Sequence, residues 1–120
     1  MVEIQMGVIE SQFADIIWQH EPIKAAELAK YSEKELKWKK TTSYTVLKRL
    51  CDKGIFQNDK GVVTSLISRK EFYSLQSRKF VEDTFEGSLP AFIAAFTNGR
   101  ALTQKDRAQI RKMINNAEED

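Results

Sequence analysis

Apolar side chains recur at helical spacing in three stretches of the first half of the chain. The first covers residues 10–20 and ends at Pro22, which cannot continue a helix. A shorter helix is expected over residues 25–31, and the polar residues 32–37 either extend it or begin a loop. The third stretch has an apolar stripe formed by Val46, Leu47, Leu50 and Cys51. Gly54 follows this stripe, where glycine favours a left-handed helix end.

The period of the pattern changes after this third helix. Residues 55–57 and 62–67 are rich in β-branched and aromatic side chains, which suit strands. The sequence Asn58-Asp59-Lys60-Gly61 separates them and is typical of a tight hairpin turn. Three short helices followed by a hairpin outline a winged helix-turn-helix domain, so we expect a mostly α fold with a small β-hairpin.

Helical spacing returns in the second half of the chain. Ser68 can cap a helix over residues 69–85, and Pro90 fits the first turn of the next helix, where proline is tolerated. Thr103 and Asp106 resemble a capping box at the start of a last helix. The sequence thus predicts three further helices after the hairpin.

These later helices have more apolar residues than a thin helical extension can bury. A second copy of the chain would cover them, so we expect a symmetric homodimer. The residues expected in its interface are Phe72, Phe80, Phe85, Leu89, Phe92, Ile93, Phe96, Ile110, Met113 and Ile114. The predicted organisation is a winged-helix DNA-binding domain at residues 1–68 and a helical dimerisation region at residues 69–120.

Composition agrees with a folded domain that has a small oligomerisation element. The chain has 120 residues, of which 42% are hydrophobic and 30% are charged. No apolar run approaches the roughly 18 residues of a transmembrane helix. The first residues, MVEIQMGVIESQF, lack the basic start and apolar core of a secretory signal. We therefore expect a cytoplasmic protein with no membrane partner.

The inventory of reactive side chains argues against catalysis. The one cysteine, Cys51, cannot form an internal disulfide or a multi-cysteine zinc site, and the one histidine, His20, is expected at a helix end rather than as a ligand. Cys51 is expected to pack as a small hydrophobe, with a redox role as the alternative. Trp18 and Trp38 are expected in the core. We predict a non-enzyme without a metal or cofactor.

Positive charge is concentrated around the third helix. Residues 37–53 contain six basic side chains and one acidic one, a local charge of +5 in a chain whose net charge is +2. Such an element indicates a polyanionic partner, and the third helix of a winged-helix domain enters the DNA major groove. The candidate DNA-binding residues are Lys39, Lys40, Thr41, Thr42, Thr45, Lys48, Arg49 and Lys60. The alternative is that these residues form an ordinary solvent-exposed helix face without a binding role. Thr41, Thr42 and Ser43 are also expected to cap the helix start.

Four segments resemble the penicillinase-repressor family, which includes the BlaI, MecI and copper-responsive CopY repressors. They are IIW at residues 16–18, the stretch from Trp38 through SYTVLKRL to CDKGI, SLISRKEFY at residues 65–73, and FEGSLPAFIAAF at residues 85–96. The resemblance implies a homodimeric winged-helix transcriptional repressor that binds a palindromic operator. It places the family's DNA-contacting positions at Thr41, Thr42, Thr45 and Arg49.

Three departures from the family pattern concern regulation and the helix start. Lys39-Lys40 stands where the family usually has Ser-Pro. The chain ends in AEED, without the C-terminal cysteine pairs of the copper-responsive members. Ala95-Phe96 replaces the Asn-Phe pair at which β-lactam-responsive members are cleaved. An inducer or sensor protein is a further expected partner, and a winged-helix protein-interaction adaptor without DNA binding is the rival function.

Overall fold

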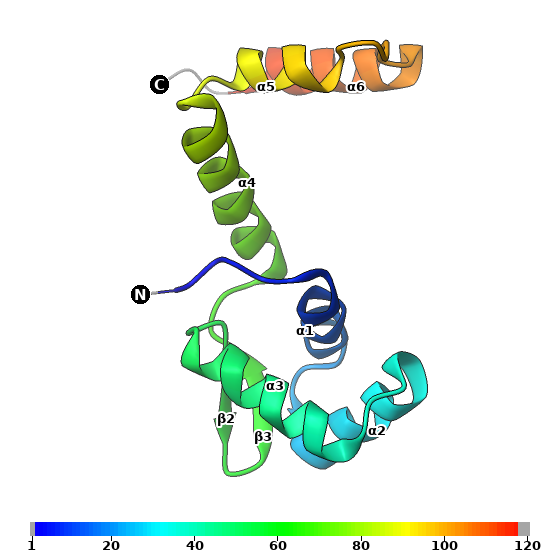
Figure 1. Cartoon of the computed structure of the whole chain (residues 1–120), viewed down its shortest axis with the longest axis vertical. Helices are drawn as coiled ribbons and strands as arrows, with labels where there is room; N and C mark the ends of the chain where they lie inside the picture. Colours follow the sequence, from blue (N-terminus) through cyan, green and yellow to red (C-terminus); the bar gives the residue numbers. More distant parts are fainter. Residues whose placement is uncertain (1, 118–120) are drawn as a thin grey trace. The chain divides into compact units, whose positions relative to one another are not determined.

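The computed structural model describes residues 2–117 and divides into two compact units, residues 1–78 and 79–120. Residue 1 and residues 118–120, the outer ends of the two predicted domains, lie outside the described part. The described elements are α1 (Val8–His20), β1 (Ile23–Lys24), α2 (Ala25–Leu36), α3 (Lys40–Asp52), β2 (Phe56–Asp59), β3 (Val62–Ser65), α4 (Arg69–Phe85), α5 (Leu89–Phe96) and α6 (Gln104–Asn116) (Figure 1). The predicted class, mostly α with a winged helix-turn-helix order, is confirmed.

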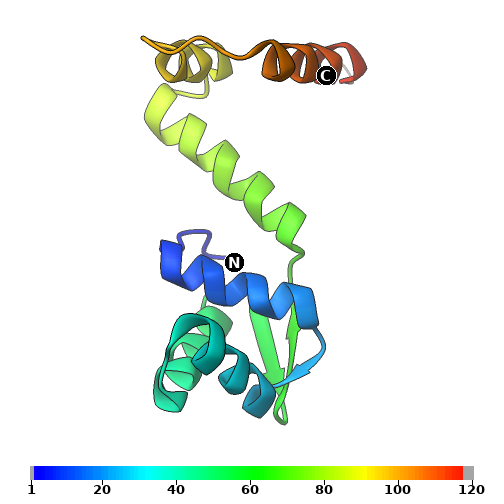
Figure 2. The same cartoon turned by 90° about the vertical axis from the view of Figure 1, so that its right-hand side faces the viewer.

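The wing is a β-hairpin extended by a very short strand. The three strands run antiparallel in the order β1-β3-β2, with Ile23 opposite Val63. Lys60 and Gly61 form the two-residue turn with φ of 50° and 90°, the pair of positive values that a type I′ hairpin turn requires. The side chain of Asn58 closes the turn by accepting a hydrogen bond from the Gly61 N–H at 2.9 Å. Figure 2 shows the hairpin extending away from α1.

One apolar core holds the first unit together. It lies between the three helices and the sheet and includes the start of α4; its largest fully buried apolar side chains are Phe13, Ile17, Leu28, Leu50, Ile55, Phe56, Val63 and Phe72. Both tryptophans pack against this core, as expected from the sequence. Trp38 stacks on Phe13 with ring centres 5.1 Å apart, and the Trp18 indole N–H donates to the Ile67 carbonyl oxygen at 3.1 Å.

Helix α3 begins differently from the prediction. Lys39 is its N-cap and contributes no side-chain cap, so the expectation that Thr41, Thr42 or Ser43 caps the helix is wrong. The two threonines lie inside the first turn, and Ser43 faces the core with its hydroxyl unpartnered among residues 2–117. The other end agrees with the sequence, because Gly54, the residue after the C-cap Lys53, adopts φ of 81°.

The second unit contains the last part of α4 together with α5 and α6. Two features of its helix starts are as predicted: Pro90 lies in the first turn of α5, and the Thr103 hydroxyl accepts from the Asp106 N–H at 3.0 Å at the start of α6. The cap of α5 was not predicted; it is Ser88, whose hydroxyl accepts from the Ala91 N–H at 3.1 Å. Within the described chain, no residue of α5 or α6 is buried. The rings of Phe80, Phe85, Phe92 and Phe96 touch one another at centre distances of 5.6–6.2 Å.

Candidate nucleic-acid interface

The outward face of α3 carries all the helix candidates together. Its inward face is fixed by Val46, Leu47 and Leu50, which are buried against the core. Because a helix turns once in 3.6 residues, the positions on the opposite side of α3 face solvent. The structure places these exposed candidates on or beside α3: Lys39, Lys40, Thr41, Thr42, Thr45, Lys48 and Arg49. The result is a hydroxyl-rich and basic surface on one helix.

Three cations of this face are available to a polyanion. Lys39, Lys40 and Arg49 have no ion-pair partner within residues 2–117. Lys48 pairs with Asp52 one turn later at 3.2 Å, but their side chains are 79% and 67% exposed. An ion pair in water contributes less than about 1 kcal/mol. A phosphate can therefore replace Asp52 as the partner of Lys48 at small cost.

The first turn of α3 is also open to an anion. The first N–H groups of a helix carry its positive dipole end, and those without a partner can bind an anion. In α3 the N–H groups of Thr42 and Ser43 donate to the Lys39 carbonyl oxygen, at 3.0 and 3.2 Å. The N–H groups of Lys40 and Thr41 are therefore the ones left for an anion. Within residues 2–117 no side chain caps this turn, and Thr41 and Thr42 lie there with exposed hydroxyls. Thr45 differs, because its hydroxyl donates to the Thr41 carbonyl oxygen at 2.9 Å. Because that bond uses the hydroxyl hydrogen, Thr45 can contact a ligand through its methyl group and its oxygen lone pairs.

The wing places one further candidate at its tip. Lys60 is exposed in the hairpin turn, next to Asp59, which offsets part of its charge. The base of the wing is fixed by Glu21, just after α1. The Glu21 carboxylate accepts from the Ser65 N–H at 2.8 Å and from the Ser65 hydroxyl at 2.7 Å. The wing therefore extends from the unit on an anchored base.

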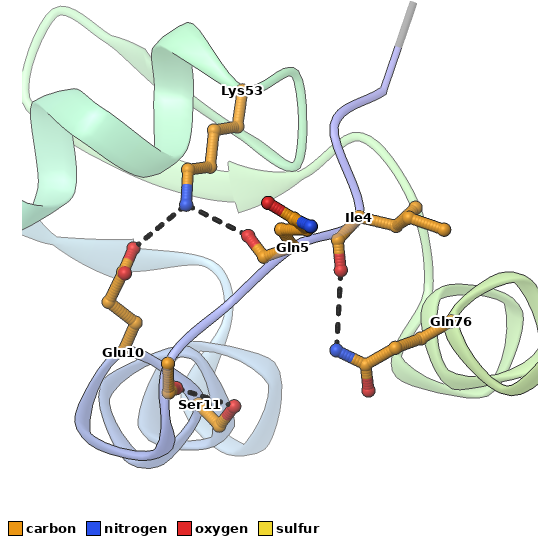
Figure 3. Close-up of polar contacts among 7 residues, drawn as sticks. Ile4, Gln5, Glu10, Ser11, Lys53 and Gln76 are labelled. Atoms are coloured by element: carbon orange, nitrogen blue, oxygen red, sulfur yellow. Dashed lines mark hydrogen bonds and ion pairs between the residues drawn. The ribbon is translucent and has the colours of Figure 1, made fainter. Parts of the chain in front are cut away.

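Lys53, which contributes to the positive charge of residues 37–53, lies in a different setting from the exposed cations. It is the C-cap of α3, and its ammonium group contacts Glu10 at 3.2 Å, with side chains only 14% and 18% exposed (Figure 3). Sequence reasoning missed this pair and the extended segment that covers it. The alternation of Val2, Ile4 and Met6 with polar residues was the available signal.

Cys51 and His20, the other potentially reactive side chains, pack against neighbouring residues of the first unit. Burial raises the pKa of the Cys51 thiol, and the charge of Asp52 raises it further. A raised pKa leaves little of the reactive thiolate at neutral pH. The His20 ring contacts the Ile16 carbonyl oxygen at 2.8 Å and packs on Tyr31 with ring centres 4.3 Å apart.

Comparison with known proteins assigns the chain to a family. The family model described as "Penicillinase repressor" matches residues 6–116. The chain belongs to the penicillinase repressor family. The penicillinase repressor of Bacillus licheniformis is 24% identical over 114 residues, covering 92% of this chain and 89% of that protein. The match spans both units and every candidate residue named above.

Penicillinase repressors are regulators of transcription, not a known enzyme family. Membership in this family therefore supports a winged-helix transcriptional repressor. In the part of the chain that the structure describes, no helix combines the length and the apolar character needed to span a membrane.

Phe72, one residue of the expected dimer interface, is not accessible to a second copy of the chain. Phe72 is fully buried in the core of the first unit, where its ring lies 5.7 Å from that of Trp18. It serves the fold of a single chain, so the expectation that it contacts a second copy is wrong. The sequence did not separate it from the other phenylalanines because it lies on the same helix as Phe80 and Phe85.

The other interface candidates lie in the second unit and remain accessible. Phe80, Leu89, Phe96, Met113 and Ile114 are exposed large apolar residues, with Met113 at 67% and Ile114 at 68%. Phe85, Phe92, Ile93 and Ile110 are half-buried.

Proposed function

We propose that this protein is a homodimeric repressor that binds a palindromic operator through α3 and blocks the promoter that contains it. Lys39, Lys40, Thr41, Thr42, Thr45, Lys48 and Arg49 form the proposed DNA-binding surface of α3, and Lys60 contacts a phosphate from the wing. The proposal rests on one observation above all: the exposed face of α3 gathers hydroxyls, cations and an uncapped first turn on one helix.

Each part of this surface suits a different part of duplex DNA. The major groove admits one α-helix, and side chains on the helix face read base edges there. Arg49 is the one arginine of α3 and is long enough to reach a guanine edge with two hydrogen bonds. Lys39 and Lys40, next to the uncapped first turn, suit phosphates. The methyl group of Thr45 suits a thymine methyl.

The exposed apolar residues of the second unit support the proposed dimer. Exposing Leu89, Phe96, Met113 and Ile114 together to water is unfavourable by about 25 cal/mol for each Å² of apolar surface. A contact with the same unit of a second copy removes that surface from water and gives two-fold symmetry. Two copies of α3 related by such an axis match the two halves of a palindromic operator.

The test is an Arg49→Ala variant in a mobility-shift assay. The probe is a duplex selected by the parent protein from a random-sequence library, and an unselected duplex is the reference. We expect the variant to lose about 1–3 kcal/mol on the selected duplex, because a base contact disappears. Arg78→Ala removes an exposed arginine from α4 and is the matched control; it should leave both affinities at the parent value.

Two outcomes would contradict the proposal. If Arg49→Ala binds both duplexes as the parent does, Arg49 does not read the operator. If the parent selects no duplex at low salt, the protein has kept the winged-helix fold without DNA binding, as the adaptor hypothesis states. A salt titration adds a third check, because each lost phosphate contact should reduce the log–log slope by about 0.9.

A further inference from the structure

The chain begins with an extended segment that packs along the first unit. We call residues 2–7 the N-terminal arm. Val2, Ile4 and Met6 are half-buried against the core, whereas the alternate residues are exposed. Successive side chains of an extended segment point to opposite sides, so one side of the arm faces the core and the other faces water.

Lys53 fastens the arm to the end of α3. The Glu3 N–H donates to the Lys53 carbonyl oxygen at 2.9 Å, and the Lys53 ammonium group donates to the Gln5 carbonyl oxygen at 2.8 Å. The same ammonium group donates to the Glu10 carboxylate in the first turn of α1 at 3.2 Å (Figure 3). Because this ion pair is largely removed from water, breaking it leaves a poorly solvated charge.

The arm has a second attachment, to α4. The Gln76 side-chain amide donates to the Ile4 carbonyl oxygen at 3.2 Å. Figure 3 shows Lys53 and Gln76 meeting the arm from opposite sides. The arm therefore links the C-terminal end of α3 to α4, and Lys53 links it to α1. All these residues belong to the first unit.

We propose that the N-terminal arm and Lys53 position α3 for operator recognition, although neither contacts a base. This inference rests on the proposed DNA binding of α3. Hydrogen bonds to base edges need a fixed helix angle, because they act over short distances and in narrow directions. Attraction to phosphates is long-ranged and tolerates a tilted helix. A loosened α3 should lose preference for its operator while keeping its general affinity for DNA.

The direct test is a chain that starts at Met6 and so lacks most of the arm. It loses the hydrogen bonds made by Glu3, Ile4 and Gln5, each of which stabilises the folded state modestly. We expect affinity for the parent-selected duplex to fall on the order of tenfold, with unselected affinity and salt slope unchanged. Gln76→Leu removes one attachment from the full chain and should shift affinity in the same direction by a smaller amount.

Two lysines near the end of α3 provide a matched comparison. Lys48→Met removes an exposed cation of the proposed DNA surface, so it should weaken both duplexes and reduce the salt slope by about 0.9. Lys53→Met removes a cation that is already paired with Glu10 and covered by the arm. It should therefore lower preference for the selected duplex and leave the slope unchanged.

Amide exchange gives a readout that needs no DNA. The N–H groups of Lys53, Gly54 and Ile55 donate to carbonyl oxygens at the end of α3, at 3.0–3.2 Å. Without the arm, their exchange should accelerate on the order of tenfold, because the end of α3 opens more often. If the parent selects no duplex, the proposed function fails while this measurement still tests the attachment.

Three results would overturn the inference. The first is unchanged exchange at the end of α3 in the shortened chain. The second is unchanged operator preference in the shortened chain, which would limit the arm to fold stability. The third is an equal loss on both duplexes, which would make the arm a phosphate contact. If the shortened chain does not fold, Gln76→Leu and Lys53→Met decide between the same results.

Discussion

The two units of this chain use phenylalanine in opposite ways. In the first unit, Phe13, Phe56 and Phe72 are completely buried and hold helices and sheet together. In the second unit, no residue of α5 or α6 is buried in the described chain, and Phe96 is 57% exposed. The first unit therefore buries its phenylalanines within one chain, whereas the second leaves Phe80 and Phe96 exposed and available for a partner. A similar share of aromatic residues supports a monomeric core in one case and a proposed interface in the other.

The largest expected effect is the difference in stability lost when a buried and an exposed phenylalanine are each replaced by alanine. Phe72→Ala should lower the free energy of unfolding of the first unit by about 3–5 kcal/mol, because it leaves a cavity beside Trp18. Urea denaturation followed by tryptophan fluorescence measures this, since Trp18 and Trp38 both lie in that unit. Phe96→Ala is the matched control and should leave the fluorescence transition in place. Equal shifts for the two variants would contradict the division.

The second unit can be tested through its proposed partner. Phe96→Glu should raise the dimer dissociation constant on the order of a hundredfold, because a charge would enter an apolar interface. Sedimentation equilibrium over a range of concentrations measures the change. Phe96→Leu keeps an apolar side chain at the same position and should remain dimeric. A dimer that survives the glutamate would place the interface elsewhere.

Helix caps should matter in the second unit, because none of its residues between 79 and 117 is buried. Ser88→Ala removes the hydroxyl that accepts from the Ala91 N–H, and should cost about 0.5–2 kcal/mol. Thermal unfolding followed by far-UV circular dichroism measures it. Ser77→Ala in α4 is the control, since that hydroxyl bonds the Tyr73 carbonyl oxygen inside a helix, where alanine is the better helix former. A loss for Ser77→Ala that equals the loss for Ser88→Ala would contradict a special role for the cap.

The smallest expected effect concerns Cys51 at the edge of the first core. Its pKa is raised by burial and by Asp52, so the folded thiol should react with iodoacetamide at pH 8 more slowly than the urea-unfolded chain. A raised pKa also means that the folded state gains stability below the pKa of the unfolded thiol, near 8.5, and loses it as pH rises through the folded value. Cys51→Ala should abolish that alkaline loss. A native thiol that reacts as fast as the unfolded one would contradict this setting.

Local sequence signals predicted the parts of the fold that local interactions control. Asn58-Asp59-Lys60-Gly61 predicted the hairpin because Gly61 accepts a positive φ without strain and the Asn58 side chain accepts a hydrogen bond that closes the turn. Ser68 and Thr103 predicted helix starts because their hydroxyls replace missing partners of the first turn. The start of α3 was mispredicted, because three adjacent hydroxyl residues offered several equivalent caps and the helix took none of them.

The sequence by itself determined the order of helices and wing and the apolar side of each helix, since these depend on periodicity and turn chemistry. Only the tertiary structure decided which charges and rings share a surrounding. It gave Lys48 and Lys53, five positions apart on one chain segment, opposite roles: one exposed, the other paired with Glu10 beneath the N-terminal arm. It also separated Phe72 from Phe80 on one helix. Burial depends on contacts between distant segments, and no local pattern specifies them.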